Sequence, residues 1–308
     1  MFGWNMKFNY LKNTYTYRLL FFSILFLIGC GKDEVSPEIP SISFIPQAKE
    51  IQTRASFING SNDFNRFVVW GNYDGKAVFT QQEVTKGSNG WEYSPLQTWV
   101  LSANQYDFSA YAQIGTGTPN ISNNQLSSID INCKISQVDL IMAYTTVPKA
   151  DIGKKVVMDF KHALTAVNFS FKLKEGFSYL NTYKVTRIKW GNIYTQGRLI
   201  LNPNNTIISS PTGSLGEMNA ITTFTGTSFT TTTAMESDFQ FVIPQTQTDA
   251  TLTFMLDING ESKEIVKTVA IDWEPGKRYT YSISFDPFEI TIETTPWDVP
   301  DMKDIIVQ

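Results

Sequence analysis

The chain of 308 residues has little histidine, cysteine or charge. It contains one histidine, two cysteines and 18% charged residues, with 25 Lys and Arg against 29 Asp and Glu. A single imidazole excludes a histidine-rich metal site, and two cysteines exclude a disulfide framework or a four-thiolate zinc site. The formal charge of −4 argues against a nucleic-acid partner, which would require a basic surface.

Aromatic residues, glycine, serine and threonine are abundant instead. Aromatic residues make up 14% of the chain and there are 19 glycines. This mixture favours β-sheets joined by many turns over helices. At roughly 100–200 residues per domain, the length indicates about two domains.

The first 29 residues have the features of a signal peptide. Three basic residues precede an apolar run at 19–28, which is shorter than the roughly 20 residues of a membrane-spanning helix. The run ends in Leu27-Ile28-Gly29-Cys30, which resembles a bacterial lipobox. That resemblance implies cleavage before Cys30 and lipidation of its thiol; the alternative is an ordinary signal peptide with a chance cysteine.

Residues 30–40 follow as a charged segment with prolines, which predicts an extended tether that buries no apolar surface. Its beginning, Cys30-Gly-Lys-Asp-Glu34, also resembles the signal that directs Bacteroidetes lipoproteins to the outer face of the outer membrane. Removal of residues 1–29, which contain three basic and no acidic residues, leaves 22 basic and 29 acidic residues and a charge of −7. Cys133 is then the one unmodified thiol, so an intramolecular disulfide is excluded.

The remainder of the chain alternates between apolar and polar residues in short runs separated by turn signals, which predicts an all-β protein of sandwich type. Residues 115–128, rich in Gly, Thr, Asn and Ser, are predicted to form a loop. A short helical pattern at 161–167 is the alternative to a strand there. We divide the chain near residue 160 into domains at 41–160 and 161–308. Predicted strands include 42–44, 64–70, 106–111, 139–144, 157–160, 167–171, 183–190, 197–201, 239–243, 252–256, 279–285 and 288–292.

Evidence for catalysis is weak. The chain has no Gly-x-Ser-x-Gly, Walker or Gly-x-Gly-x-x-Gly motif, so we expect neither an enzyme nor a cofactor. His162 with Cys133 or a serine would make a nucleophilic dyad, but a buried structural histidine is favoured. Asp139 and Asp159 are the acids with the most apolar neighbours, and a glycosidase needs only two carboxylates; such acids more often lie at strand ends.

Two hypotheses about binding, of calcium and of sugar, stay open. Residues 72–74 offer oxygen ligands for calcium, although their spacing is not that of an EF-hand. Trp91, Trp99 and Trp190 would suit a sugar-binding platform if exposed, while burial would make them core residues. No metal site is expected.

The succession of strands resembles the fimbrillin family, the subunits of Bacteroidetes type V pili. The most specific segments are Phe160-Lys-His162-Ala-Leu and Trp273-Glu-Pro-Gly276-Lys-Arg-Tyr279-Thr-Tyr281. The resemblance extends over nearly all of the mature chain. It implies two tandem transthyretin-like β-sandwich domains and a structural subunit for adhesion, exported as a lipoprotein. The matching segments also include the lipobox, Thr53-Arg54-Ala55, Tyr106-Asp-Phe108, Asp139-Leu-Ile-Met-Ala143, Val242-Ile-Pro244-Gln245 and Pro296-Trp297.

The resemblance also implies a route of assembly. An Arg-specific protease would cleave between Arg54 and Ala55 and release the strand that contains Ile42 and Phe44. A strand from another subunit would then fill the vacated groove, which is donor-strand addition. The candidate donor is the C-terminal segment with Ile305, Ile306 and Val307.

The implied partners are other pilus subunits, the outer membrane through the lipid on Cys30, the protease, and host or bacterial surface ligands. The implied location is the outer membrane and the fimbrium. Two alternatives stay open: a surface glycan-binding lipoprotein that does not polymerise, and a hydrolase with convergent carboxylates.

Overall fold

The computed structural model is all-β in the part of the chain that it describes. That part contains no α-helix, and one 3₁₀ turn, η1 (Lys149–Asp151), joins the strands at Ile141–Pro148 and Val156–His162. No helix in this part has the length and apolar character needed to cross a bilayer. The predicted all-β class is therefore confirmed. The described residues are 39–48, 63–174, 183–220, 228–229, 234–285 and 290–297.

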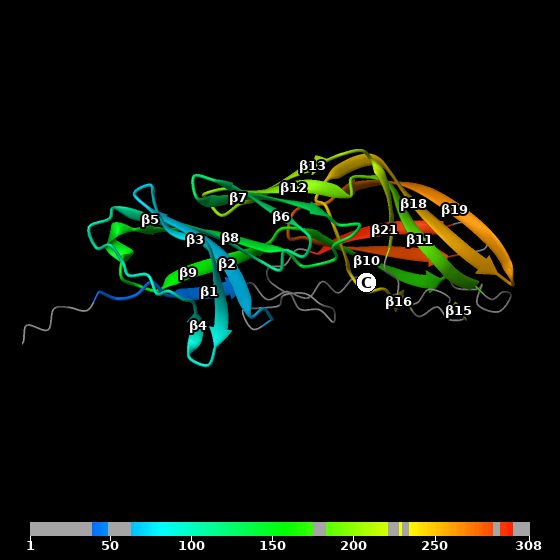
Figure 1. Cartoon of the computed structure of the whole chain (residues 1–308). Helices are drawn as coiled ribbons and strands as arrows, with labels where there is room; N and C mark the ends of the chain where they lie inside the picture. The colour runs from blue at the N-terminus through cyan, green and yellow to red at the C-terminus, as the bar shows by residue number, and fades with distance from the viewer. Residues whose placement is uncertain are drawn as a thin grey trace, which may run out of the picture. The chain divides into compact units, whose positions relative to one another are not determined.

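The first sheet has seven strands and curls around an aromatic core. Phe44 on the first strand contacts the rings of Phe67 and Phe79, at centroid distances of 5.7 and 5.6 Å, although these lie on strands near the opposite end of the sheet. The curling brings the two ends of the sheet together, so the first strand completes the core. In order, the strands are β1 (Phe44–Ala48), β9 (Val156–His162), β8 (Ile141–Pro148), β5 (Gln105–Ala112), β2 (Arg66–Tyr73), β3 (Lys76–Gly87) and β4 (Gly90–Glu92) (Figure 1).

A second sheet of four strands covers the outer face of the first. Its order is β13 (Ile207–Thr212), β12 (Gln196–Leu201), β7 (Gln125–Asn132) and β6 (Thr118–Ser122). Buried residues of β7 pack in one hydrophobic cluster with Trp70, Tyr111 and Met142 of the first sheet. Strands β12 and β13 follow residue 160 in the sequence, but β12 pairs with β7, which precedes it (Figure 1). The domain division at residue 160 stays a prediction.

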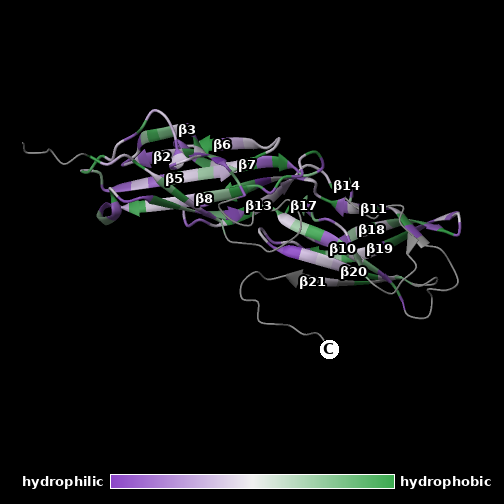
Figure 2. Ribbon diagram, turned by 90° about the horizontal axis from the view of Figure 1, so that it is seen from below, coloured by the Kyte–Doolittle hydropathy of each residue, from purple (hydrophilic) through white to green (hydrophobic). Residues whose placement is uncertain are grey.

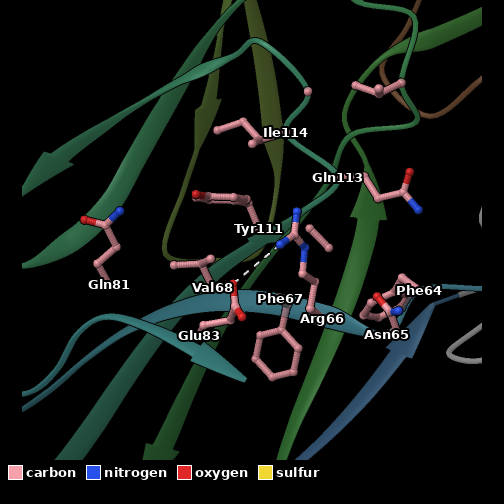
Figure 3. A pocket seen from close by; sticks show the side chains of 13 residues that line it. Phe64, Asn65, Arg66, Phe67, Val68, Gln81, Glu83, Tyr111, Gln113 and Ile114 are labelled. Atoms are coloured by element: carbon pink, nitrogen blue, oxygen red, sulfur yellow. Dashed lines mark ion pairs between the residues drawn. The ribbon is translucent and has the colours of Figure 1, made fainter. Parts of the chain in front are cut away.

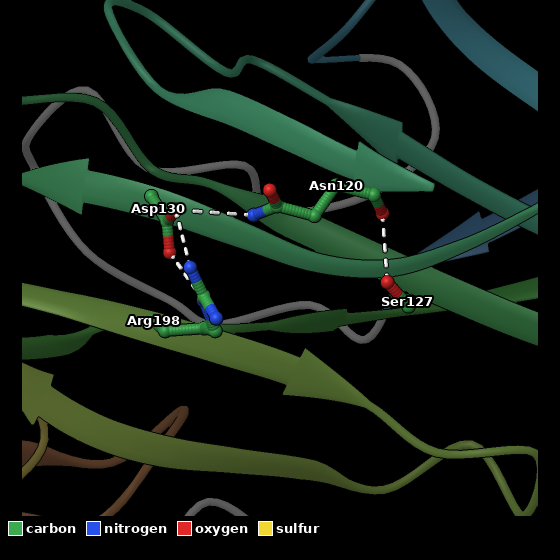
Figure 4. A network of polar contacts seen from close by, with 4 residues as sticks. All are labelled: Asn120, Ser127, Asp130 and Arg198. Atoms are coloured by element: carbon green, nitrogen blue, oxygen red, sulfur yellow. Dashed lines mark hydrogen bonds and ion pairs between the residues drawn. The ribbon is translucent and has the colours of Figure 1, made fainter. Parts of the chain in front are cut away.

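A network of polar side chains spans the pairing of β7 and β12. Arg198 binds both carboxylate oxygens of Asp130, at 2.6 and 2.9 Å, and the Asn120 amide donates to the same carboxylate (Figure 4). Ser127 donates to the main-chain oxygen of Asn120. The Arg198 guanidinium lowers the pKa of Asp130 below its usual range. These contacts connect β6, β7 and β12.

Two further sheets face each other in the C-terminal part. The strand orders are β16-β10-β20-β21, with β17 also on β10, and β14-β11-β18-β19, with β15 also on β11. Phe171 of one sheet meets Phe254 of the other in a T-shaped contact with centroids 6.0 Å apart. The bounds are β10 (Thr165–Leu173), β11 (Tyr183–Ile193), β14 (Gly216–Asn219), β15 (Ser228–Phe229), β16 (Met235–Glu236), β17 (Gln240–Val242), β18 (Thr246–Ile258), β19 (Glu261–Asp272), β20 (Arg278–Phe285) and β21 (Ile290–Trp297).

Alternation of apolar and polar residues explains most strands. In β20 the residues at every second position from Tyr279 to Phe285 are buried, as a period of two requires, and Figure 2 shows apolar and polar residues alternating along the strands. One local expectation was wrong, and one alternative did not hold. The predicted loop at 115–128 contains β6 and the start of β7, and the helical pattern at 161–167 is the end of β9 and the start of β10.

Candidate functional site: the inserted strand β1

Strand β1 contributes its inward side chains to the core of the first sheet. Ile42, two residues before the start of β1, is 1% exposed, Phe44 is 4% exposed and Pro46 is buried, whereas Ile45, between Phe44 and Pro46, is 38% exposed. This is the alternation expected of a strand with one buried face. The structure thus places both residues of the predicted displaced strand in the core.

One side of β1 lies along β9. The two strands run parallel in a continuous register from Phe44 opposite Val156 to Ala48 opposite Phe160. Val156 N–H donates to the Ser43 oxygen at 2.7 Å. The main-chain groups of Ser43, and of every second residue after it, therefore point toward β9. Pro46 lies out of phase with Ser43, so its missing N–H faces away from β9 and costs no bond in this ladder.

The other side of β1 is held at its beginning by residues 93–98. Ile42 N–H donates to the Gln97 oxygen at 2.8 Å, and Ser41 forms an antiparallel bridge with Thr98. The Tyr93 hydroxyl donates to the Ile42 oxygen at 2.7 Å and accepts from Gln97 N–H at 3.4 Å. The hydroxyl therefore takes the place of a direct ladder bond. We call residues 93–98 the clasp.

Burial of the clasp tyrosine affects its chemistry. Desolvation raises the pKa of Tyr93, and the hydrogen bond with Gln97 opposes this only in part. The hydroxyl is therefore protonated over the physiological pH range and keeps its donor hydrogen. No sequence pattern indicates this role, because a tyrosine between a short strand and a proline has no feature specific to main-chain binding.

Several predicted residues lie outside the described ranges. These are the lipidation residue Cys30, the cleavage residues Arg54 and Ala55, and the candidate donor residues Ile305, Ile306 and Val307. The segment 49–62, which contains Arg54, follows β1 directly in the sequence.

The histidine forms a pair with an acid and not with the cysteine. His162 Nδ1 lies 2.7 Å from Asp139 Oδ1, and both side chains are at least nine-tenths buried. A carboxylate only accepts hydrogen bonds, so Nδ1 is the donor. Cys133 is fully buried, and burial raises the pKa of its thiol well above the usual range. A buried neutral thiol is a poor nucleophile, which favours the structural interpretation of both residues.

Asp139 also acts on a buried arginine of the C-terminal part. Arg278 is 2% exposed, and burial lowers its pKa to about 10, an effect that the charge of Asp139 opposes. The second acid of the proposed carboxylate pair, Asp159, lies on β9 and is half-buried. Asp139 therefore stabilises positive charge within the fold, which is a structural role for this acid.

The loop at 72–74 is held by protein groups. The carboxylate of Asp74 accepts from the main-chain N–H of Asn104 at 3.1 and 3.2 Å. The Asn72 side chain donates to the main-chain oxygen of Asn123 and accepts a hydrogen bond from the Asn124 side chain. Among the described residues, no group of three or more His, Cys, Asp or Glu side chains is arranged to hold a metal ion.

The tryptophans of the proposed sugar platform do not lie on one exposed face. Trp99 and Trp190 are buried, and Trp91 packs on Phe64 and Phe67 with centroids 5.4 and 5.3 Å apart. Trp91 is half-buried, so the three indoles form no exposed platform, which was the feature that would have favoured glycan binding.

A surface hollow of about 500 Å³ lies beside β2 and β3 (Figure 3). Arg66 and Glu83 form an ion pair of 3.7 Å there, with side chains 72% and 53% exposed. Gln81 and Gln113 line the same hollow with positive φ angles of 51° and 54°. Three aromatic residues line this hollow, Phe64, Phe67 and Tyr111, and all three are buried.

Comparison with known proteins gives the family. A sequence profile described as fimbrillin-like matches residues 53–297. The chain belongs to the fimbrillin-like family. No curated protein sequence matches it significantly.

Solved structures support the fold of this fimbrillin-like chain. It is similar to a candidate cell adhesion protein from Bacteroides uniformis, with a TM-score of 0.59 and 16% identity over 85% of this chain and 99% of the other. It is also similar to a fimbrial protein from Bacteroides vulgatus, with a TM-score of 0.58 and 15% identity over 83% and 98% of the two chains. At these identities the likeness establishes the fold and not the activity.

Proposed function

We propose that this fimbrillin-like protein is the precursor of a structural subunit of a surface fimbrium or adhesin. It is exported as a lipoprotein and held to the outer membrane through Cys30. Cleavage after Arg54 separates the tether and β1 from the rest of the chain, and subunits then assemble by donor-strand addition. The family match and the similarity to a fimbrial protein from Bacteroides vulgatus support this proposal.

The position of β1 is the observation that carries the proposal. It is the terminal strand of its sheet, yet its inward side chains fill the core. Burial of one large apolar side chain is worth about 2 kcal/mol, so loss of Ile42 and Phe44 leaves a groove that is costly to expose. The main-chain groups of β9 would lose their partners as well. A strand from another subunit restores both.

Assembly then proceeds from head to tail. Each subunit offers a groove and donates a strand, so the contact is not self-complementary, and its repetition builds a filament unless the rotation between subunits closes a ring. The proposed donor is the segment with Ile305, Ile306 and Val307, whose β-branched residues suit an added strand.

Limited proteolysis tests the proposal. We expect the purified precursor, treated with a low dose of trypsin or of an Arg-specific protease, to form SDS-resistant ladders, and Arg54→Ala to form none with the Arg-specific protease; trypsin can also cleave after Lys49 in the same segment. Arg54→Lys is the matched control, because trypsin cleaves after lysine and an Arg-specific protease does not. Trypsin should therefore produce ladders from this variant and an Arg-specific protease should not. Equal ladders from wild type and Arg54→Ala under both proteases would overturn the proposal.

A further inference from the structure

The ring of Phe44 lies in a cage of four aromatic rings. Its centroid is 5.7 Å from Phe67, 5.6 Å from Phe79, 6.0 Å from Tyr93 and 5.7 Å from Phe108. The contacts with Phe67 and Phe108 are T-shaped, with planes at 88°. In such contacts the positive ring edge meets the negative ring face. An aliphatic side chain at this position lacks that complementarity.

The clasp fixes the main chain two residues before this cage. Ile42 is bound through its N–H by Gln97 and through its oxygen by Tyr93. On the strand, both bonds involve only main-chain atoms, so any strand in the groove can form them. They place the residue two positions after the bound one in the cage, so the side chain at that position is the one the cage contacts.

From these contacts we infer that the Phe44 position is the selectivity pocket of the groove. The partner that replaces β1 is an extended strand from a different kind of subunit, with an aromatic side chain at this position and held in register by Tyr93. Residues 298–308 of this chain, its own candidate donor, contain no aromatic residue, so that donor serves another groove. The inference rests on the proposed function, because only a subunit that exchanges β1 offers the groove to a partner.

The outer face of the same strand has no cage and does not require an aromatic side chain. Ile45 pairs with Val157 of β9, and the two are 38% and 42% exposed. The residue next to the pocket is thus a matched control, since it has the same strand environment but an open face.

Peptide binding tests the selectivity. The probe is a fluorescent peptide with the sequence of residues 39–48, added to the full chain after cleavage by an Arg-specific protease. We expect the Phe44→Ala peptide to bind at least about 100-fold more weakly than the wild-type peptide. The Ile45→Ala peptide should bind within about threefold of the wild-type peptide. The uncleaved chain, with β1 in place, should bind none.

A swapped peptide tests the register. It carries Phe at position 42 and Ile at position 44, so its composition is unchanged, and the wild-type chain should reject it. The Tyr93→Phe chain keeps the aromatic ring but lacks the hydroxyl, and we expect it to discriminate about fivefold less between the two peptides.

The outcomes separate the two proposals. A cleaved chain that binds no peptide would overturn strand exchange, and with it the inference. Binding of the wild-type and Phe44→Ala peptides with equal affinity would overturn the selectivity pocket and leave strand exchange standing. Unchanged discrimination in Tyr93→Phe would overturn the role of the hydroxyl.

Discussion

At the residue scale, the buried polar groups near residue 160 stabilise the fold. Asp139 accepts a hydrogen bond from His162 and opposes the effect of burial on Arg278. The three residues come from the segment before β8, the end of β9 and β20. A carboxylate that serves two buried basic groups is worth more than an exposed one, because water does not replace it.

Removal of this carboxylate should therefore be costly. We expect Asp139→Ala to lower the free energy of unfolding by about 3 kcal/mol, measured by urea denaturation. Glu83→Ala is the control, because its ion pair with Arg66 is largely exposed, and it should cost less than about 1 kcal/mol. Similar losses in both variants would contradict the structural role of Asp139.

At the element scale, β1 and the β7–β12 pair are the two informative strand pairings. The alternation in β1 gives a prediction for the intact precursor. Phe44→Ala should lower the free energy of unfolding by about 3 kcal/mol or more, since it empties an aromatic cage. Ile45→Ala should change it by less than about 1 kcal/mol. Thermal unfolding checks both, and an equal shift in melting temperature would mean that β1 is not inserted.

The β7–β12 pairing gives a pH prediction. Arg198 lowers the pKa of Asp130, so the pair adds stability above the ordinary carboxyl pKa of about 3.9, and this is lost as the pH falls through the lowered value. The side chains are 49% and 41% exposed, so solvent screening keeps the effect small. We expect the gap in unfolding free energy between wild type and Arg198→Gln to be largest near neutral pH and to vanish in acid.

Arg198→Lys serves as the control for this titration. Lysine keeps the positive charge but cannot form the bidentate contact with Asp130, so this variant should retain part of the pH dependence of the unfolding free energy. A gap between wild type and Arg198→Gln that does not change with pH would show that Asp130 does not titrate against Arg198.

At the scale of the whole molecule, the described residues from Ser41 onward form one compact unit. Strand β12 pairs with β7 in the same sheet, so Leu199 lies opposite Ile129, and both are buried. A fragment of residues 39–174 lacks β12, and we expect it to be aggregated or poorly protected in hydrogen exchange. The same fragment with residues 195–213 appended through a flexible linker should recover protection. Equal protection of both fragments would argue for an autonomous N-terminal domain.

Attachment to the membrane is the other prediction at this scale. We expect Cys30→Ala to abolish incorporation of labelled palmitate and to release the protein from the membrane fraction. Cys133→Ala is the control, because its thiol is buried, and it should retain the label. Equal labelling of the Cys30→Ala variant and the wild type would refute lipidation at Cys30.

The sequence by itself determined the all-β class and the positions of most strands. Alternation with a period of two is a local property, so runs such as 42–44 and 279–285 could be read without knowledge of their neighbours. The two strands at 118–122 and 125–132 were missed because their polar composition matches that of a loop. They become strands through pairing with each other and, in the case of β7, with β12, and that pairing is not local.

Only the tertiary structure decided what each strand touches. The sequence indicated that Ile42 and Phe44 belong to a strand, but not that Phe44 enters a cage formed by β2, β3, β5 and Tyr93. Nor did it indicate that a hydroxyl 51 residues further along the chain holds Ile42. The same holds for His162, whose partner, Asp139, lies 23 residues earlier. Such contacts depend on how the sheet curls and which ends meet, and no periodicity within a strand records that.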